Sequence, residues 1–189
     1  MAGPDLKASV YIATSVDGFI ARKDGGLDWL PGAARTAGDE DEIALEDFGF
    51  QEFLDTVDVL VMGRNTYEAV LGFGQWPYGS KRVIVLSSKP IQIGEDQAGT
   101  VEWRSCSPPD LVKELSESGV EHIYVDGGKT IQGFIEAGLI QEITITKIPV
   151  IIGRGIPLFG PLSTDIRLAH IETRSFANGL VQSKYRVIE

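Results

Sequence analysis

Two segments of this chain share a pattern in which a short apolar run ends in glycine directly before a helix-forming stretch. They are VDVLVMGRNTYEAV (57–70) and EHIYVDGGKTIQGFI (121–135). Continuous apolar runs are typical of strands that are buried on both faces of a parallel sheet. A glycine turn that joins such a strand to a helix indicates a βα unit, so the chain is expected to fold as an α/β protein.

The same two turns are candidate ligand sites. Glycine lets the backbone come close to a ligand, and the start of a helix offers unpaired N–H groups and a partial positive charge. A basic residue, Arg64 or Lys129, lies beside each turn. Each turn alone fits an ordinary tight connection equally well, whereas the pair favours a ligand with several phosphates, such as a dinucleotide.

The remaining chain continues to alternate strands with helices and then ends in strands. Further strands are expected at 8–14, 82–88, 100–105, 142–152, 166–176 and 180–188. Further helices are expected from about Glu42 to Leu54 and from Pro108 to Gly119. The last two strands are joined by a hairpin signal at 177–179. We therefore expect one three-layer α/β domain over 1–189, with a mostly parallel mixed sheet and an antiparallel C-terminal edge.

The composition argues against several classes of function. A net charge of −10 disfavours nucleic acids and anionic membranes as partners. No apolar run approaches the roughly 20 residues that cross a bilayer, and the N-terminus does not resemble a signal peptide. A single cysteine, Cys106, fits a reducing compartment, so a cytoplasmic location is expected. His122 and His170 are far apart in sequence without a third ligand, so no metal site is expected.

Six motifs follow one another along the chain: ATSVDGFIA with Trp29 after it, VMGRNTYEAV, KRVIVLSSKP, VEW, YVDGGKTI and ITITKI. Together they resemble the dihydrofolate reductase superfamily over nearly the whole sequence, and the VMGR-x-T-[YW]-E block followed by VIVLSS is specific. The stretch IPVIIGRGIPLFG and the segment Phe48 to Leu54 look like one branch of that superfamily. This branch holds the reductase domain of riboflavin biosynthesis and its stand-alone bacterial relatives.

The resemblance implies that NADPH lies across the C-terminal ends of the strands. The first turn would hold the pyrophosphate and the adenosine side through Gly63, Arg64, Asn65 and Thr66. The second turn would close over the pyrophosphate through Gly127, Gly128, Lys129 and Thr130. The adenine ribose and its 2′-phosphate would lie against Leu86, Ser87 and Ser88. Arg64 and Lys89 add charge that favours NADPH over NADH. The loop that contains Ala13, Asp17, Gly18 and Ile20 would shield the nicotinamide.

Hydride transfer from NADPH to a C=N bond also needs a proton donor for the nitrogen, and two carboxylates are candidates. By the spacing of the family, the acid on the first helix is Asp47, with Glu46 beside it. In an apolar wall of phenylalanines this carboxyl would have a raised pKa and could act as an acid. Both residues could equally face water on a helix. A secondary candidate is Asp126, directly before the second glycine turn.

Four residues are expected around the substrate: Trp29, Phe50, Lys81 and Thr146. Lys81 stands where folate reductases present an arginine, and Gln132 replaces their aromatic residue after the glycine turn. These departures count against folate. We therefore expect an NADPH-dependent reductase that transfers a hydride to a C=N or C=O bond of a small heterocycle. The alternatives are a pyrimidine reductase of riboflavin type and a non-catalytic NADPH-binding protein. The resemblance further implies a homodimer.

Overall fold

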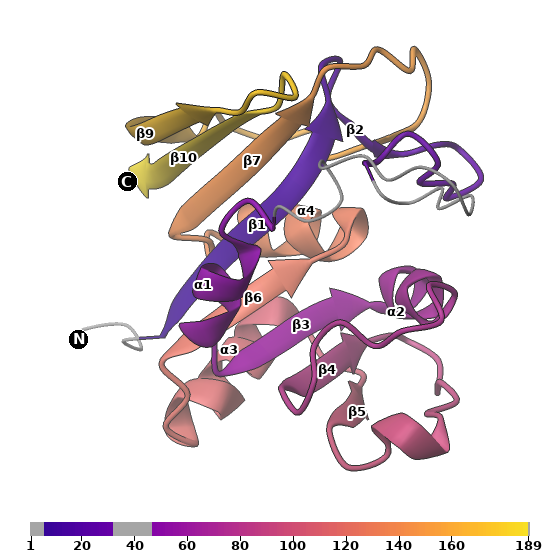
Figure 1. The fold of residues 1–189 in the computed structure, drawn as a ribbon. Helices are drawn as coiled ribbons and strands as arrows, with labels where there is room; N and C mark the ends of the chain where they lie inside the picture. The colour runs from indigo at the N-terminus through magenta and orange to yellow at the C-terminus, as the bar shows by residue number, and fades with distance from the viewer. Residues whose placement is uncertain (1–5, 32–46, 189) are drawn as a thin grey trace.

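The computed structural model describes residues 6–31 and 47–188, which form one eight-stranded sheet with helices on both faces (Figure 1). The strands stand in the order β5-β4-β3-β6-β1-β7-β10-β9. Their bounds are β1 Lys7–Ser15, β3 Val59–Gly63, β4 Arg82–Leu86, β5 Val101–Arg104, β6 His122–Asp126, β7 Glu142–Ile148, β9 Arg167–Ser175 and β10 Val181–Ile188. A separate antiparallel pair is formed by β2 (Phe19–Ala21) and β8 (Ile156–Pro157).

The sheet is parallel from β5 to β7 and antiparallel at the edge formed by β10 and β9. The part of the chain that the structure describes has four α-helices beside the sheet: α1 Phe50–Asp55, α2 Arg64–Leu71, α3 Pro108–Glu117 and α4 Gly128–Glu136. A short 3₁₀ turn, η2, spans Glu95–Gln97. The expected fold class, a three-layer α/β protein with an antiparallel C-terminal edge, is confirmed. No helix among the described residues is long and apolar enough to cross a membrane.

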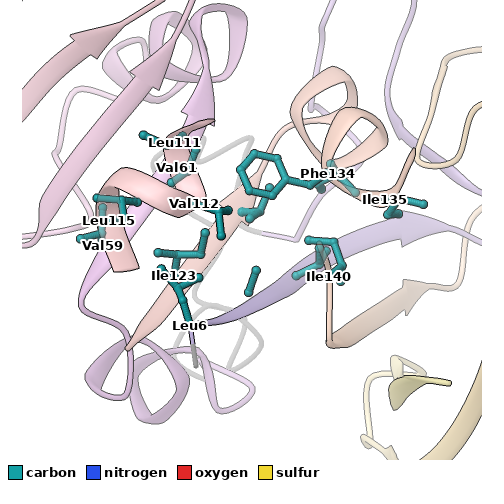
Figure 2. Packing of buried hydrophobic residues seen from close by; sticks show 14 of the residues in the cluster. Leu6, Val59, Val61, Leu111, Val112, Leu115, Ile123, Phe134, Ile135 and Ile140 are labelled. Atoms are coloured by element: carbon teal, nitrogen blue, oxygen red, sulfur yellow. The ribbon is translucent and has the colours of Figure 1, made fainter. Parts of the chain in front are cut away.

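Strand β3 is apolar at every position before its terminal glycine because each of its faces packs against a different layer of helices. Val59 and Val61 of β3 face α3 and α4, in a cluster that includes Leu111 and Phe134 (Figure 2). The alternate residues of β3 point to the other face, where Leu60 packs in a cluster with residues of α1 and α2. Burial of each such apolar side chain contributes about 1.5–3 kcal/mol to the free energy of folding.

The first helix is much shorter than the sequence predicts. The expected helix ran from about Glu42 to Leu54, and its part before residue 47 lies outside the described residues. Within them the prediction is wrong, because α1 begins only at Phe50. Phe48 and Gly49 have φ angles of 53° and 86°, in the left-handed region, and two consecutive residues of that kind cannot continue a right-handed helix.

Strands β3 and β6 lie side by side but send their helices to opposite faces of the sheet. The register pairs Met62 with Asp126, so Gly63 and Gly127 follow at the same edge. Helix α2 packs in the cluster on one face through Tyr67, and α4 packs in the other cluster through Ile131. Ligands of open α/β sheets bind at such a topological switch point, outside the carboxyl ends of the strands.

Candidate active site

The two glycine turns are in direct contact, as a common ligand requires. A Cβ at Gly63 would lie 2.8 Å from Oγ1 of Thr130, and a Cβ at Gly127 would overlap Oγ1 of Thr66. Each glycine therefore makes room for the threonine of the opposite helix. Gly127 also has a φ of 89°, which side-chain-bearing residues rarely adopt. This reciprocal packing brings the amino ends of α2 and α4 together.

Neither of these two helices carries a side-chain cap. The cap positions are Gly63 and Gly127, and within residues 6–31 and 47–188 no side chain bonds to the first-turn N–H groups of α2 or α4. In α3, by contrast, the hydroxyl of Ser107 accepts from the N–H of Asp110. First-turn N–H groups without an intrahelical partner are matched by a ligand or by water. The two glycine turns thus offer an uncapped set of donors that suits phosphate oxygens.

The residues predicted to bind the adenosine side of the ligand also lie at the carboxyl ends of the strands. Gly63 pairs with Leu86 at the end of β4, and Ser87 and Ser88 follow. Oγ of Ser87 accepts from the N–H of Lys89 at 3.2 Å, which fixes the turn and directs this loop beyond the end of the strand. Arg64 is exposed at the start of α2, and its Nε lies 3.6 Å from Oε1 of Glu68. An exposed ion pair of this kind contributes little to the stability of the fold. The guanidinium of Arg64 can therefore exchange this partner for a phosphate.

The loop expected over the nicotinamide covers the second glycine turn. A Cβ at Gly128 would lie 2.9 Å from Cδ1 of Ile20, so Ile20 of β2 packs onto the amino end of α4. The carboxylate of Asp17 joins this loop to the segment after β7, because it accepts from the N–H groups of Ile152 and Gly153 at 3.3 and 2.7 Å. Asn65 and Lys129, in the first turns of α2 and α4, are exposed.

Asp126 is at the end of β6, beside both glycine turns. Burial raises the pKa of its carboxyl to about 6, although hydrogen bonds from the Gly127 N–H and from Tyr124 act in the opposite direction. The Gly127 N–H donates to Oδ1 at 2.8 Å. An acid with a pKa near neutrality at this edge can deliver a proton and regain it from solvent.

Asp47 does not have the raised pKa that the sequence suggested. It is exposed, and its carboxylate accepts from the N–H groups of Gly49 and Gln51 at 3.0 and 2.9 Å. These backbone hydrogen bonds lower the pKa of Asp47. The carboxylate caps the start of α1, because Phe48 and Gly49 turn the chain so that Asp47 faces the first N–H groups of the helix. The expectation of a protonated acid in an apolar wall is therefore wrong for Asp47.

Phe50 and Thr146 lie on the same face of the sheet as Asp126. The ring centroid of Phe50 is 5.7 Å from that of Tyr11 and 6.1 Å from that of Tyr124. Thr146 pairs with Ala13 across β7 and β1 and is buried. Phe50 and the two tyrosines thus form an aromatic cluster on the face of the sheet that Asp126 shares.

Gln182, on β10, is a member of this region that sequence reasoning missed. Its amide Nε2 lies 3.0 Å from Oγ1 of Thr146, 2.8 Å from the hydroxyl of Tyr11 and 3.2 Å from the carbonyl of Phe48. The Tyr11 hydroxyl donates to the same Phe48 carbonyl at 2.6 Å. The antiparallel edge thereby holds the segment that leads into α1. In the sequence, the only signal for this role is that Gln182 is a polar residue within the predicted strand 180–188.

One expected substrate residue, Lys81, is not brought to the glycine turns. Lys81 lies before the amino end of β4, at the opposite end of the strand, where Nζ donates to the carbonyl of Val57 at 2.6 Å. Trp29 is half-buried, and Nε1 has no hydrogen-bond partner among the residues that the structure describes. The structure therefore gives Lys81 a packing role and leaves the contact of Trp29 with substrate as a prediction.

A cavity of about 260 Å³ lies elsewhere, under α1 at the amino ends of the strands. Lys7, His122 and Glu142 line it, and the Glu142 carboxylate is 2.8 Å from Nζ of Lys7 and 3.3 Å from Nζ of Lys184. Glu142 thus pairs with both lysines at this cavity. No residue of the two glycine turns lines this cavity, but Tyr11, Phe48 and Gln182 do, so the cavity adjoins the Gln182 region.

Known proteins resemble this chain over its whole length. Residues 8–182 match the family described as the RibD C-terminal domain. The uncharacterized protein YwjB of Bacillus subtilis (strain 168) is 32% identical over 179 residues, covering 93% of this chain and 95% of YwjB. A crystal structure of a Shewanella sp. PV-4 protein named for riboflavin biosynthesis has 36% identity and a TM-score of 0.84, covering 97% of this chain and 100% of that protein.

A more distant structure shares the fold. The dihydrofolate reductase of Enterococcus faecalis, complexed with NADP(H) and RAB-propyl, has a TM-score of 0.64 at 18% identity and covers 100% of both chains. The resemblance to the reductase domain of riboflavin biosynthesis is therefore confirmed, and the fold is that of dihydrofolate reductase. The chain belongs to the RibD C-terminal domain family.

Proposed function

We propose that the protein is an NADPH-dependent reductase that transfers a hydride to a C=N or C=O bond of a small heterocyclic substrate. One observation carries the proposal: the amino ends of α2 and α4, without side-chain caps, meet at the topological switch point of the sheet. The match to the RibD C-terminal domain family, which consists of reductase domains, supports it. This arrangement offers two sets of backbone donors to one ligand with several phosphates.

The residues present fit the phosphates of NADPH. The pyrophosphate would bind the N–H groups of the two turns, held by Gly63, Arg64, Asn65 and Thr66 on one side and by Gly127, Gly128, Lys129 and Thr130 on the other. The adenine ribose and 2′-phosphate would lie against Leu86, Ser87 and Ser88. The exposed guanidinium of Arg64 and the ammonium of Lys89 supply the positive charge that a 2′-phosphate needs.

The reduced nicotinamide, when bound, supplies a hydride from its C4 position. Ala13 and Ile20 would exclude water from that transfer, because Ile20 packs on the second glycine turn and Ala13 adjoins buried Thr146. Asp126 would deliver a proton to the nitrogen or oxygen of the reduced bond, so that hydride and proton together saturate it. The resulting carboxylate regains a proton from solvent, which a pKa of about 6 permits near neutral pH.

The match to the RibD C-terminal domain favours a pyrimidine as the heterocycle. In such a reduction, the hydride and the proton would convert the open-chain ribosyl phosphate of a pyrimidine into a ribityl phosphate. Of the basic residues, Arg154 is exposed beside the loop that Asp17 anchors and could meet such a phosphate. Lys81 is a poorer candidate because Val57 already engages its ammonium.

The proposal extends to assembly and location. The outer strand β9 is exposed along its length, with Leu168 and Ile171 at 40% and 42% exposure, and such an edge suits pairing with a second copy. We therefore propose a homodimer. A free, exposed Cys106 is compatible with the reducing cytoplasm, where a reductase finds its reduced cofactor.

Two glycine variants test the cofactor site with a matched control. Gly127 and Gly119 have φ angles of 89° and 84°, so alanine strains the backbone at both positions. A Cβ collides with Thr66 at Gly127, whereas at Gly119 nothing lies within 4 Å. We expect Gly127→Ala to weaken NADPH binding at least tenfold and Gly119→Ala to leave it unchanged, as measured by energy transfer from tryptophan to nicotinamide. Equal affinities for both variants would contradict the proposed site.

Turnover separates the enzyme from a binding protein. NADPH oxidation is followed with dihydrofolate and with an open-chain ribosylaminopyrimidine phosphate. Oxidation that depends on the pyrimidine supports the riboflavin-type reaction, and oxidation with dihydrofolate supports a folate-like substrate. Tight NADPH binding without oxidation across a panel of heterocycles would indicate a non-catalytic NADPH-binding protein instead.

A further inference from the structure

Trp103, on the edge strand β5, holds the turn that follows β4. Its indole Nε1–H donates to the main-chain carbonyl of Ser87 at 2.9 Å. The N–H of Ser87 donates to the carbonyl of Arg104 at 3.0 Å, which continues the pairing of β4 with β5 by one residue beyond Leu86. Strand β5 therefore fixes the peptide groups on both sides of Ser87, one through its backbone and the other through the side chain of Trp103.

These contacts leave the hydroxyl proton of Ser87 available. A serine hydroxyl has one proton and two lone pairs. Oγ of Ser87 accepts from the N–H of Lys89 at 3.2 Å, which uses a lone pair and not the proton. The carbonyl of Ser87 already accepts from Trp103. The hydroxyl can therefore donate to an external acceptor, such as a phosphate oxygen.

The cations near this turn divide into two groups. Arg104 is engaged by carboxylates, because its Nη2 lies 2.6 Å from Oε2 of Glu102 and its Nε lies 3.6 Å from Oε1 of Glu114. Arg64 and Lys89 are exposed near the carboxyl ends of β3 and β4. These two cations can supply the charge that attracts a phosphate, while the turn supplies a hydroxyl donor in a fixed place.

We propose that Trp103 is a positioning residue for cofactor discrimination: by fixing the Ser87 carbonyl, its indole N–H orients the turn that distinguishes a 2′-phosphate from a free 2′-hydroxyl. This role rests on the proposed binding of NADPH at the glycine turns. It implies that loss of the indole N–H changes the affinity for NADPH and not that for NADH. An indole that served only the packing of the sheet would affect both cofactors alike.

Two tryptophan variants form a matched pair. Trp103→Phe keeps an aromatic ring on β5 and removes the N–H that Ser87 accepts. Trp76→Phe is the control, because Nε1 of Trp76 is buried without a hydrogen-bond partner in the part of the chain that the structure describes. Calorimetric titration with NADPH and with NADH gives both affinities without relying on tryptophan fluorescence. We expect Trp103→Phe to weaken NADPH binding about fivefold, the effect of one hydrogen bond, and NADH binding by less than about twofold.

The control variant should leave the ratio of the two affinities unchanged. Equal losses for both cofactors in Trp103→Phe, or no loss for either, would overturn the proposal while the wild type still binds NADPH. A wild type that binds neither cofactor would instead refute the proposed function, and this role with it. The two failures are therefore distinguishable by the wild-type titration.

A measurement on the wild-type protein decides the question if Trp103→Phe does not fold. The chain has three tryptophans, so assignment of two indole ¹⁵N signals with Trp29→Phe and Trp76→Phe leaves the third to Trp103. We expect this third signal to shift at saturation with 2′,5′-ADP, which carries the 2′-phosphate, and to shift much less with 5′-AMP, which lacks it. An equal shift with both nucleotides, or none with either, would overturn the proposal.

Discussion

Replacing Asp126 with asparagine is expected to stabilise the protein at neutral pH. The carboxyl has an ordinary pKa of 3.8 and a folded-state pKa of about 6, because burial disfavours its charged form. Between these values the folded protein binds more protons than the unfolded chain, so the free energy of unfolding falls as pH rises from about 4 to about 6. Above that range the folded protein carries the full cost of the buried charge.

The pKa difference sets the size of the effect. A difference of about two pH units corresponds to about 3 kcal/mol, at about 1.4 kcal/mol per unit. Asparagine keeps the shape of the side chain and its acceptor for the Gly127 N–H but carries no charge. Partial access of solvent to the carboxyl reduces the gain, so we expect Asp126→Asn to be about 1–3 kcal/mol more stable than the wild type at pH 8.

Urea denaturation at pH 4 and at pH 8 measures this effect. The variant should exceed the wild type at pH 8, and the two proteins should converge at pH 4, where the wild-type carboxyl is protonated in the folded state. Asp58→Asn offers a control carboxylate, because Asp58 is exposed at the other end of the strands. A variant that is less stable than the wild type at pH 8, or a difference that is independent of pH, would refute the reasoning.

Three further outcomes follow from the structure. Asp47→Ala removes the acceptor for the Gly49 and Gln51 N–H groups; it should lower the free energy of unfolding by about 1 kcal/mol and leave reductase turnover intact. Loss of turnover at unchanged stability would instead make Asp47 the acid. Arg64→Ala should weaken NADPH at least tenfold and NADH little in a binding titration, and equal losses would argue against a 2′-phosphate contact. Light scattering should give twice the chain mass, which a monomer would contradict.

Local sequence signals were sufficient for the fold and for the glycine turns. A run such as 57–63 is apolar at every position because β3 is buried on both faces, and its terminal glycine marks the start of α2. The contact of Gly63 with Thr130 and of Gly127 with Thr66 depends on the order of strands, which places β6 beside β3 although β4 and β5 intervene in sequence. The paired pattern indicated a shared ligand but not this packing.

The acids show where sequence reasoning was insufficient. Asp47 and Asp126 each have an apolar neighbour in the sequence, Phe48 and Val125, yet one caps a helix in solvent and the other is half-buried at a strand end. The pKa direction of each depends on burial and on the N–H groups that face it, which spacing does not reveal. Gln182 is 134 residues from Phe48, so only the folded sheet brings its amide to that carbonyl.

The most direct test of the central claim is a comparison of NADPH and NADH binding to the wild-type protein by energy transfer from tryptophan to nicotinamide. We expect saturable NADPH binding, with NADH bound at least tenfold more weakly because NADH lacks the phosphate that Arg64, Ser87 and Ser88 would hold. Equal binding of the two cofactors would contradict the assignment of those residues. No binding of NADPH would contradict the reductase itself.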